Sequence, residues 1–404
     1  MLERSKPRLS VFLMVFVVAS FAVVVVQADE WPMYRGPDHT GISKETGWFD
    51  ASAGVSIIWE QKIGNGFGSI AIGGGKAYAM GNDSGKETIY CFEAKTGKKI
   101  WSFSHEAKLF VPKEPKLHVG GPGSTPTLDG ENVYAVSKYG VVRCFSADKG
   151  DVKWTTPIKS KNPQWGFAGS PLVVGDLLIL NAGSAGTAFN KKTGKLVWSS
   201  GPGYGGYATP IPIERDGKPH VLLFVRQSVI IVNAADGKKV WEFPWKTKYD
   251  INASDPIIAG ENLFVSSALG TGCCLVPLGK PDPKPIWKNK NLKSKLSGGV
   301  LYKGCIYAFD EKKLTCLDLK TGQAKWTESS LGMGVLIMSD GKLIVVSEKG
   351  KLVIAKAAPD GYKELASDEI LKSGKRCWAT PAISDGLIYV RNAIGELVCV
   401  KVGK

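Results

Sequence analysis

Several glycine- and serine-rich segments carry aromatic side chains that could hold a ligand. WGFAGSP, YGGYATP and RCWATP each place aromatic residues among small residues, directly ahead of a β-like run. Flat rings in this setting could stack on a planar ligand or line a groove for an extended polymer. The aromatic candidates are Trp165, Phe167, Tyr204, Tyr207 and Trp378.

Polar side chains near these segments offer little catalytic chemistry. They are His118, Asn252, Asp255 and Arg376, of which Asp255 is a weak candidate for a catalytic carboxylate base. The four histidines are too scattered along the chain for a zinc site, so we expect no metal centre.

Seven tryptophans recur at intervals of 39 to 53 residues. In five of these units a glycine stands four positions before the tryptophan, as Gly97 does before Trp101. Each unit contains a β-like run, a polar turn around the glycine and a second run that ends on the tryptophan, and two more β-like runs precede these. The repeated residues are Trp59, Trp101, Trp154, Trp198, Trp241, Trp287 and Trp326.

Four antiparallel strands per repeat are typical of one blade of a β-propeller. Eight units can be counted, with prolines replacing the turn in the fifth and Leu365 taking the tryptophan position in the seventh. The last unit has only three strands, whereas Trp59 lies in a strand with none before it. We therefore predict an all-β, eight-bladed propeller over residues 55–404, in which the N-terminal strand completes the C-terminal blade.

The turn sequences EAKTGKKIW, NAADGKKVW and LDLKTGQAKW resemble the tryptophan-docking motif of the PQQ-repeat proteins, named after pyrroloquinoline quinone. The resemblance covers nearly all of the chain after its leader. It implies that the seven tryptophans pack between neighbouring blades. The family includes PQQ-dependent dehydrogenases as well as non-catalytic scaffolds such as BamB-type outer-membrane assembly factors, so activity has to be argued from the site.

A dehydrogenase of this family would need PQQ, calcium, a carboxylate base and a cation near the quinone. The resemblance offers Asn252 and Asp255 as oxygen ligands and Arg376 as the cation.

Some quinoprotein alcohol dehydrogenases also carry a vicinal disulfide against the cofactor. Cys273 and Cys274 are adjacent in this chain but lie in the fifth unit, so we expect a structural or free pair. The glycines and aromatic residues ahead of the innermost strands also have a structural explanation, since eight strands crowd the axis and the aromatic side chains fill it.

The N-terminus has the three-part order of a secretory signal. Basic residues precede an apolar run over residues 11–26, and small residues suit cleavage after Ala28. We expect residues 1–28 to be a signal peptide, with an uncleaved anchor as the alternative, and no integral membrane span once the signal is removed. Residues 29–54 are expected to be an extension that packs on the propeller.

The extension contains WPMYRGPDHTGIS, which resembles a segment found before exported propellers of this type. We expect its Trp31, Tyr34 and Arg35 to fold against one face of the ring and to plug or line it.

Formal net charge is +15, and most of the basic residues are lysines. Many lysines stand beside turn glycines, where a solvated rim explains them; attraction to anionic envelope polymers or membrane surfaces is the alternative. Nucleic acid is not expected, because arginine-rich readout motifs are absent and the chain is predicted to be exported.

These features favour a monomeric, non-catalytic binding or scaffold protein in the periplasm or cell envelope, with an envelope protein or polymer at the channel face. The alternative is a PQQ- and calcium-dependent oxidoreductase acting on an alcohol or sugar.

Overall fold

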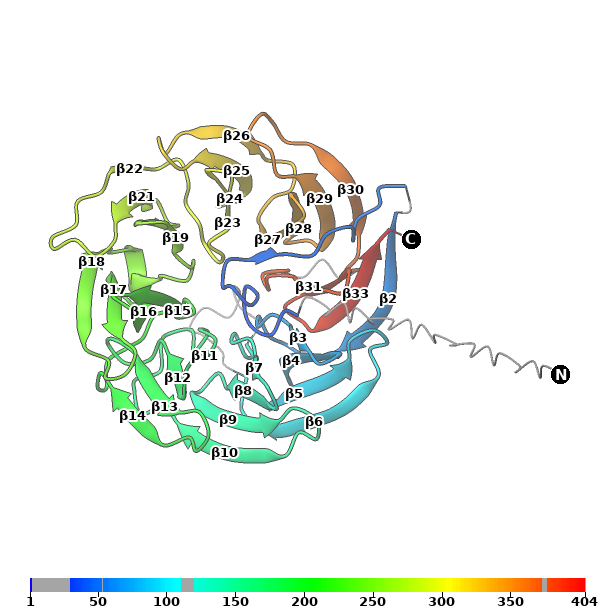
Figure 1. Ribbon diagram of the computed structural model, residues 1–404, viewed down its shortest axis with the longest axis horizontal. Coiled ribbons are helices and arrows are strands. Elements are labelled where there is room, and N and C mark those ends of the chain that lie inside the picture. The colour runs from blue at the N-terminus through cyan, green and yellow to red at the C-terminus, as the bar shows by residue number, and fades with distance from the viewer. Residues whose placement is uncertain (2–29, 53, 110–119, 373–375, 404) are drawn as a thin grey trace.

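Eight four-stranded blades stand around a central axis in the computed structural model (Figure 1). The structure describes residues 1, 30–52, 54–109, 120–372 and 376–403. The predicted eight-bladed propeller is confirmed. Nearly all of the predicted signal peptide lies outside the described residues, and among those described no helix is long and apolar enough to cross a membrane.

The blades follow one another along the chain, each running from its innermost to its outermost strand. Blades 1 to 4 contain β3 (Ala71–Gly73), β4 (Lys76–Asp83), β5 (Lys86–Glu93) and β6 (Lys99–Glu106); β7 (Thr127–Asp129), β8 (Asn132–Val136), β9 (Val141–Ser146) and β10 (Val152–Pro157); β11 (Leu172–Val174), β12 (Leu177–Leu180), β13 (Thr187–Asn190) and β14 (Leu196–Ser199); β15 (Ile211–Arg215), β16 (Lys218–Phe224), β17 (Ser228–Asn233) and β18 (Lys239–Pro244).

Blades 5 to 8 contain β19 (Ile257–Ala259), β20 (Asn262–Ser267), β21 (Gly272–Pro277) and β22 (Trp287–Asn289); β23 (Val300–Tyr302), β24 (Cys305–Asp310), β25 (Lys313–Asp318) and β26 (Ala324–Glu328); β27 (Gly334–Ser339), β28 (Lys342–Ser347), β29 (Lys351–Lys356) and β30 (Glu364–Glu369); β31 (Ala382–Ser384), β32 (Leu387–Arg391), β33 (Glu396–Val402) and β2 (Val55–Lys62). A short 3-10 helix, η1 (Lys248–Asp250), follows blade 4.

Blade 8 closes the ring in the way that the repeat count predicts. The N-terminal strand β2 pairs antiparallel with β33, and Trp59 lies opposite Cys399. The two ends of the propeller chain are thereby held in one sheet, in which β33 lies between β32 and β2, and β2 is the outermost strand.

Seven of the eight blades are bound to the next blade by a tryptophan. The Trp59 indole N–H donates to Ala94 O in blade 1 at 2.8 Å, and Trp101 Nε1 donates to Ala147 O in blade 2 at 2.9 Å. The same bond recurs between the other blades that carry a tryptophan. Its remaining pairs are Trp154 with Lys191, Trp198 with Ala234, Trp241 with Lys280, Trp287 with Leu319 and Trp326 with Ala358.

The turn glycine is required because the indole lies directly on it. A Cβ added at Gly150, whose φ is 74°, would come within 2.5 Å of the Trp101 ring. No side chain fits in that space, and the positive φ independently favours glycine. The glycine and the tryptophan of the repeat therefore form a contact between two neighbouring units of the repeat.

Four blades add a tyrosine and a cysteine to this contact. In blade 1, Tyr78 lies opposite Cys91, which lies opposite Trp101. The same row is present in blades 2, 6 and 8. All eight cysteines are free and buried, so these thiols serve as small spacers in the core. The other rows are Tyr134 with Cys144 and Trp154, Tyr307 with Cys316 and Trp326, and Tyr389 with Cys399 and Trp59.

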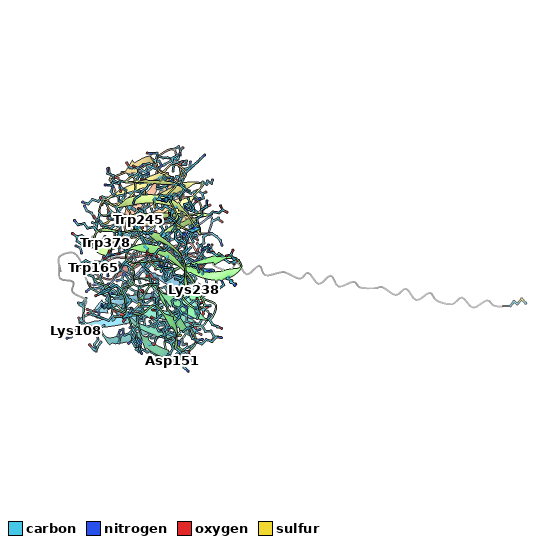
Figure 2. The ribbon with its side chains drawn as sticks, turned by 90° about the vertical axis from the view of Figure 1, so that its left-hand side faces the viewer. Lys108, Asp151, Trp165, Lys238, Trp245 and Trp378 are labelled. Carbon is cyan, nitrogen blue, oxygen red and sulfur yellow. The ribbon has the colours of Figure 1, made fainter. Side chains whose placement is uncertain are left out.

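The strand order gives the ring two distinct faces. Successive strands of a blade are antiparallel, so the first-to-second and third-to-fourth hairpins lie on one face, which we call the turn face. The second-to-third hairpins and the loops between blades lie on the other, which we call the mouth face. Figure 2 shows Trp165 and Trp378 on the mouth side and Lys238 on the opposite side.

The N-terminal segment crosses the centre of the ring (Figure 1). Its strand β1 (Ile42–Ser43) pairs in parallel with β27, at the inner edge of blade 7. Trp31, 1% exposed, pairs with Ile72 of blade 1. The Glu45 carboxylate accepts from the Asp385 N–H in blade 8. This segment thus covers the inner strands on the turn side.

We predict that Gly150→Ala destabilises the protein more than Gly130→Ala does. Both glycines have positive φ, but a Cβ at Gly130 meets nothing within 4 Å. Backbone strain should cost each variant about 1 kcal/mol, and the clash with Trp101 should bring Gly150→Ala to about 2–4 kcal/mol. Urea unfolding measures both free energies, and equal losses would contradict the docking contact.

Candidate ligand-binding mouth

Trp378 is at the centre of a cluster of aromatic and cationic side chains on the mouth face. Its ring stacks on Phe67 with centroids 5.5 Å apart and an interplanar angle of 24°. Arg376 lies over the same indole at 5.3 Å, and Lys295 approaches it at 5.5 Å. Such cation–π pairs hold positive charge beside an aromatic surface. The four residues come from the loops that precede blades 8, 1 and 6.

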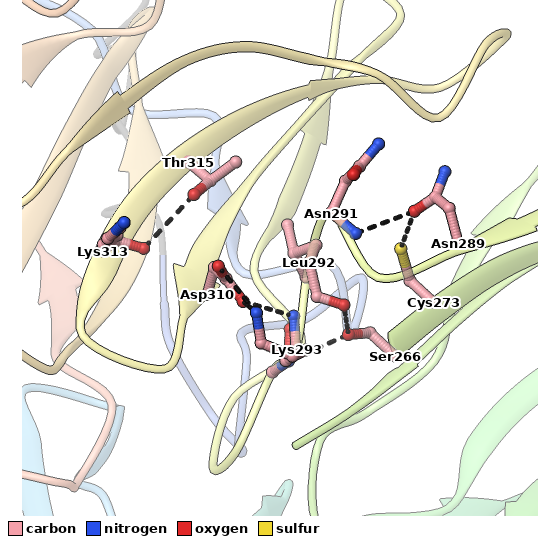
Figure 3. Close-up of polar contacts among 10 residues, drawn as sticks. Ser266, Cys273, Asn289, Asn291, Leu292, Lys293, Asp310, Lys313 and Thr315 are labelled. Atoms are coloured by element: carbon pink, nitrogen blue, oxygen red, sulfur yellow. Dashed lines mark hydrogen bonds and ion pairs between the residues drawn. The ribbon is translucent and has the colours of Figure 1, made fainter. Parts of the chain in front are cut away.

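The loop that carries Lys295 is fixed on both sides by polar contacts (Figure 3). The Lys293 ammonium pairs with Asp310 of blade 6 at 2.8 Å, and the Lys293 N–H donates to Asp310 Oδ1 at 2.9 Å. Toward blade 5, the Ser266 hydroxyl donates to Leu292 O and accepts from the Ser294 N–H. These bonds position Lys295 before any ligand arrives.

A small cavity lies beside Lys295, between blades 6 and 7. Phe309 and Met333 supply its apolar walls, and Ser297 and Glu311 are polar groups of its lining. The Ser297 hydroxyl is buried and has no hydrogen-bond partner among the described residues. The cavity therefore places a buried hydroxyl group next to the cluster around Trp378.

A second aromatic–cation cluster lies across blades 3 and 4. Tyr204, 39% exposed, has Lys161 at 5.4 Å and Arg226 at 5.0 Å from its ring centroid. Arg226 also pairs with Asp250. Tyr207 is half-buried, and burial raises the pKa of its hydroxyl to about 12; the hydroxyl hydrogen-bonds to the backbone at Trp165. The mouth face thus repeats the combination of an aromatic ring and a cation.

A buried charged pair lies below this surface, between blades 1 and 2. The Glu87 carboxylate is fully buried and accepts from the Lys138 N–H at 3.2 Å. Burial raises the pKa of Glu87 to about 7 and lowers the pKa of Lys138 to about 8. His105 and Arg143 lie beside them, 3.3 Å apart. Nothing in the sequence marks this cluster, because its members are far apart and lysine is usually a surface residue.

Asp255, the candidate base, is buried. It is 4% exposed, and its Oδ1 accepts from the Thr209 N–H at 3.1 Å. The Tyr34 hydroxyl of the N-terminal segment contacts Asp255 and Thr380, and burial raises the Tyr34 pKa. Burial also raises the pKa of Asp255, while the nearby Arg35 opposes that shift.

Other predicted residues also lie below the surface. Phe167 is 5% exposed and packs in the core of blades 2 and 3. Asn252 is fully buried: its amide donates to Val225 O and Arg226 O, and its Oδ1 accepts from Ser267. His118 lies outside the described residues. Trp165, Tyr204, Tyr207, Arg376 and Trp378 are the predicted residues that the structure places on the mouth face.

These contacts do not suit a calcium–quinone site built on Asn252 and Asp255. The Asn252 amide is already used by the blade backbone, and Tyr34 and Arg35 occupy the space around Asp255. The Arg376 guanidinium lies over the Trp378 ring, and it is not among the groups that shift the pKa of Asp255. We therefore derive no chemical step through PQQ or calcium.

The adjacent cysteines form no vicinal disulfide. Cys273 and Cys274 are both free and buried, and burial raises the pKa of each thiol to about 12. The Cys273 thiol donates to Asn289 Oδ1 at 3.2 Å (Figure 3). The pair is structural, and such protonated, enclosed thiols are poor nucleophiles.

The family model described as "Outer membrane protein assembly factor BamB" matches residues 47–206, 85–328 and 275–404. The chain belongs to this family of PQQ-repeat propellers. Among curated BamB proteins, that of Burkholderia pseudomallei is 23% identical over 61% of this chain and 61% of its own length. That of Yersinia pestis is 23% identical over 84% of this chain and 77% of its own length. The chain thus spans about three fifths of the first relative.

Solved structures of BamB-type and dehydrogenase propellers resemble this chain in fold. BamB from Moraxella catarrhalis aligns with a TM-score of 0.64 at 14% identity, covering 86% of this chain and 97% of that one. Quinohemoprotein alcohol dehydrogenase from Comamonas testosteroni aligns with a TM-score of 0.66 at 14% identity, covering 93% and 81%. At such identity the likeness concerns the architecture alone.

We predict that Glu87→Gln flattens the pH dependence of stability. The pKa of Glu87 is about 7 in the folded protein, against an ordinary value of 4.5. Between these pH values the folded protein keeps the Glu87 proton while the unfolded chain loses it, so the free energy of unfolding falls as pH rises. The wild type should lose up to about 3 kcal/mol over this window relative to the variant. Urea unfolding near pH 5 and near pH 8 measures the difference, with Glu131→Gln in an exposed turn as control. A variant with the wild-type slope would contradict the burial of this charge.

Proposed function

We propose that this chain is a non-catalytic binding or scaffold protein of the cell envelope, which presents its mouth face to a protein or polymer partner. The observation that carries the proposal is the Trp378 cluster, in which Phe67, Arg376 and Lys295 surround one indole. Aromatic and arginine side chains in such a setting are the usual anchors of binding surfaces. The positive charge of the cluster favours an anionic partner.

The N-terminal segment supports a binding role on this face. Because Tyr34 and Arg35 lie inside the ring and β1 extends blade 7, the channel is covered from the turn side. A partner is thereby directed to the mouth. The family match to outer-membrane assembly factors and the predicted secretory leader both favour action in the periplasm or envelope, as a monomer.

The runner-up function, a PQQ- and calcium-dependent oxidoreductase, rests on the fold likeness to alcohol dehydrogenases. The contacts of Asn252 and Asp255 weigh against it, because the groups that would bind the cofactor are already in use.

We expect the Trp378 cluster to determine partner binding. Trp378→Ala and Lys295→Gln should each lower the amount of partner recovered from envelope extract by roughly tenfold, since loss of an interface anchor typically costs over 1 kcal/mol. Lys98→Gln, in an exposed turn on the opposite face, is the matched control. Quantitative mass spectrometry of captured proteins and glycans gives the readout, with circular dichroism confirming the fold.

The same purified protein can be used to distinguish the scaffold function from the PQQ- and calcium-dependent oxidoreductase. Saturable PQQ binding in the presence of calcium, with dye reduction that is lost in Asp255→Ala, would establish the oxidoreductase and overturn the scaffold proposal. Recovery that is unchanged by both mouth variants would show that the partner binds elsewhere.

A further inference from the structure

The exposed hydrophobic residues of the described chain divide between the two faces. Leaving Met1 aside, those on the mouth face are Tyr139, Tyr204, Tyr249, Leu269 and Ile394. The others are all aliphatic and lie on an outer strand, or directly before it in the case of Ile286, toward the turn face. We call this second set the rim belt: Ile57, Ile58, Ile100, Val152, Leu196, Val197, Val240 and Ile286, each 40–56% exposed.

The fold does not require aliphatic residues at these positions. Along an outer strand, the tryptophan points to the neighbouring blade, and the residue before it points away and is exposed, as Val240 is before Trp241. In blades 2 and 6 a lysine, Lys153 or Lys325, takes that position. The position thus accepts a fully polar side chain, yet isoleucine or valine fills it in five blades, namely at Ile58, Ile100, Val197, Val240 and Ile286.

Lysines stand directly beside the rim belt. Lys99 precedes Ile100, Lys195 precedes Leu196, and Lys238 comes two positions before Val240. All three are exposed, and within the described residues none of them forms an ion pair with a carboxylate. Lysine beside aliphatic residues is the combination that suits the boundary between lipid headgroups and acyl chains.

The arrangement of the rim belt favours a flat partner over a concave protein groove. Its residues are spread over six consecutive blades, from blade 8 through blade 5, around the perimeter of one face. A partner that contacts them together has to be broad and planar. Protein interfaces instead gather their anchors, often aromatic, near the centre of a patch.

The N-terminal chain also reaches the ring on this face. The Gly74 N–H, in the first-to-second hairpin of blade 1, donates to Glu30 Oε1 at 2.8 Å. In the sequence, the apolar run over residues 11–26 lies shortly before Glu30. A membrane-held leader would therefore bring the turn face toward the bilayer.

We propose that the turn face rests on an anionic membrane surface, with the rim-belt side chains entering the interface and the neighbouring lysines contacting lipid phosphates. This interaction is separate from the mouth and goes beyond the proposed function. It leaves the mouth face directed away from the membrane, where a partner can reach Trp378.

Flotation of the full-length chain with lipid vesicles tests the proposal. The protein should float with vesicles of phosphatidylcholine and phosphatidylglycerol, more weakly with phosphatidylcholine alone, and less in high salt, since lysine–phosphate attraction is screened. The triple variant Leu196→Ser, Val197→Ser, Val240→Ser should bind the mixed vesicles at least tenfold more weakly. The control Leu269→Ser, Ile394→Ser changes equally exposed residues of the mouth face and should bind as the wild type does.

Lysine acylation, measured by mass spectrometry, distinguishes membrane binding through the rim belt from membrane binding through the leader alone. Mixed vesicles should protect Lys99, Lys195 and Lys238 from acylation several-fold, while Lys161 and Lys248 on the mouth face stay reactive. Undiminished flotation of the triple variant, equal protection of both faces, or no flotation at all would overturn the proposal.

Discussion

Each docking tryptophan has to lie flat on a turn of the next blade, and the rest of the molecule depends on that contact. All seven indoles donate to a backbone carbonyl of the next blade, and five of them also lie on its turn glycine, as Trp101 does on Ala147 and Gly150. A blade buries its own faces only when neighbours cover them, so the contact has to be repeated until the ring closes. β2 makes closure possible by carrying Trp59 to the last blade.

The fold could be predicted from sequence because this contact leaves a local signature. In five units the glycine and the tryptophan stand four residues apart. Five of the seven tryptophans also contact the turn glycine of the following unit, so the periodicity of these residues reveals the blades. Leu365 in blade 7 and the prolines of blade 5 show that single units tolerate departures.

The candidate site was less predictable, because its contacts are set by loops and by the N-terminal segment. Asp255 and Asn252 stand at promising positions in the sequence, yet one is enclosed by Tyr34 and the other is used by backbone carbonyls. The Glu87–Lys138 pair joins two blades and has no sequence signal. The stacking of Trp378 on Phe67, by contrast, follows from ring closure, which brings the loops before blades 8 and 1 together.

Closure also makes the two faces unequal. The N-terminal segment covers the inner strands on the turn side, while loops between blades bring aromatic rings and cations to the mouth side. A rigid ring with one covered and one accessible face is suited to holding a partner in a fixed orientation. The difference between the two faces results from packing, and holding a partner on the accessible face requires no catalysed reaction.

Hydrogen exchange of Trp59→Leu tests the closure of the ring most directly. The indole of Trp59 links β2 to the Ala94 turn of blade 1, so its loss should speed exchange in β2, β33, β5 and β6 together, as one cooperative unit. Faster exchange confined to β2, with blade 1 as protected as in the wild type, would contradict the account.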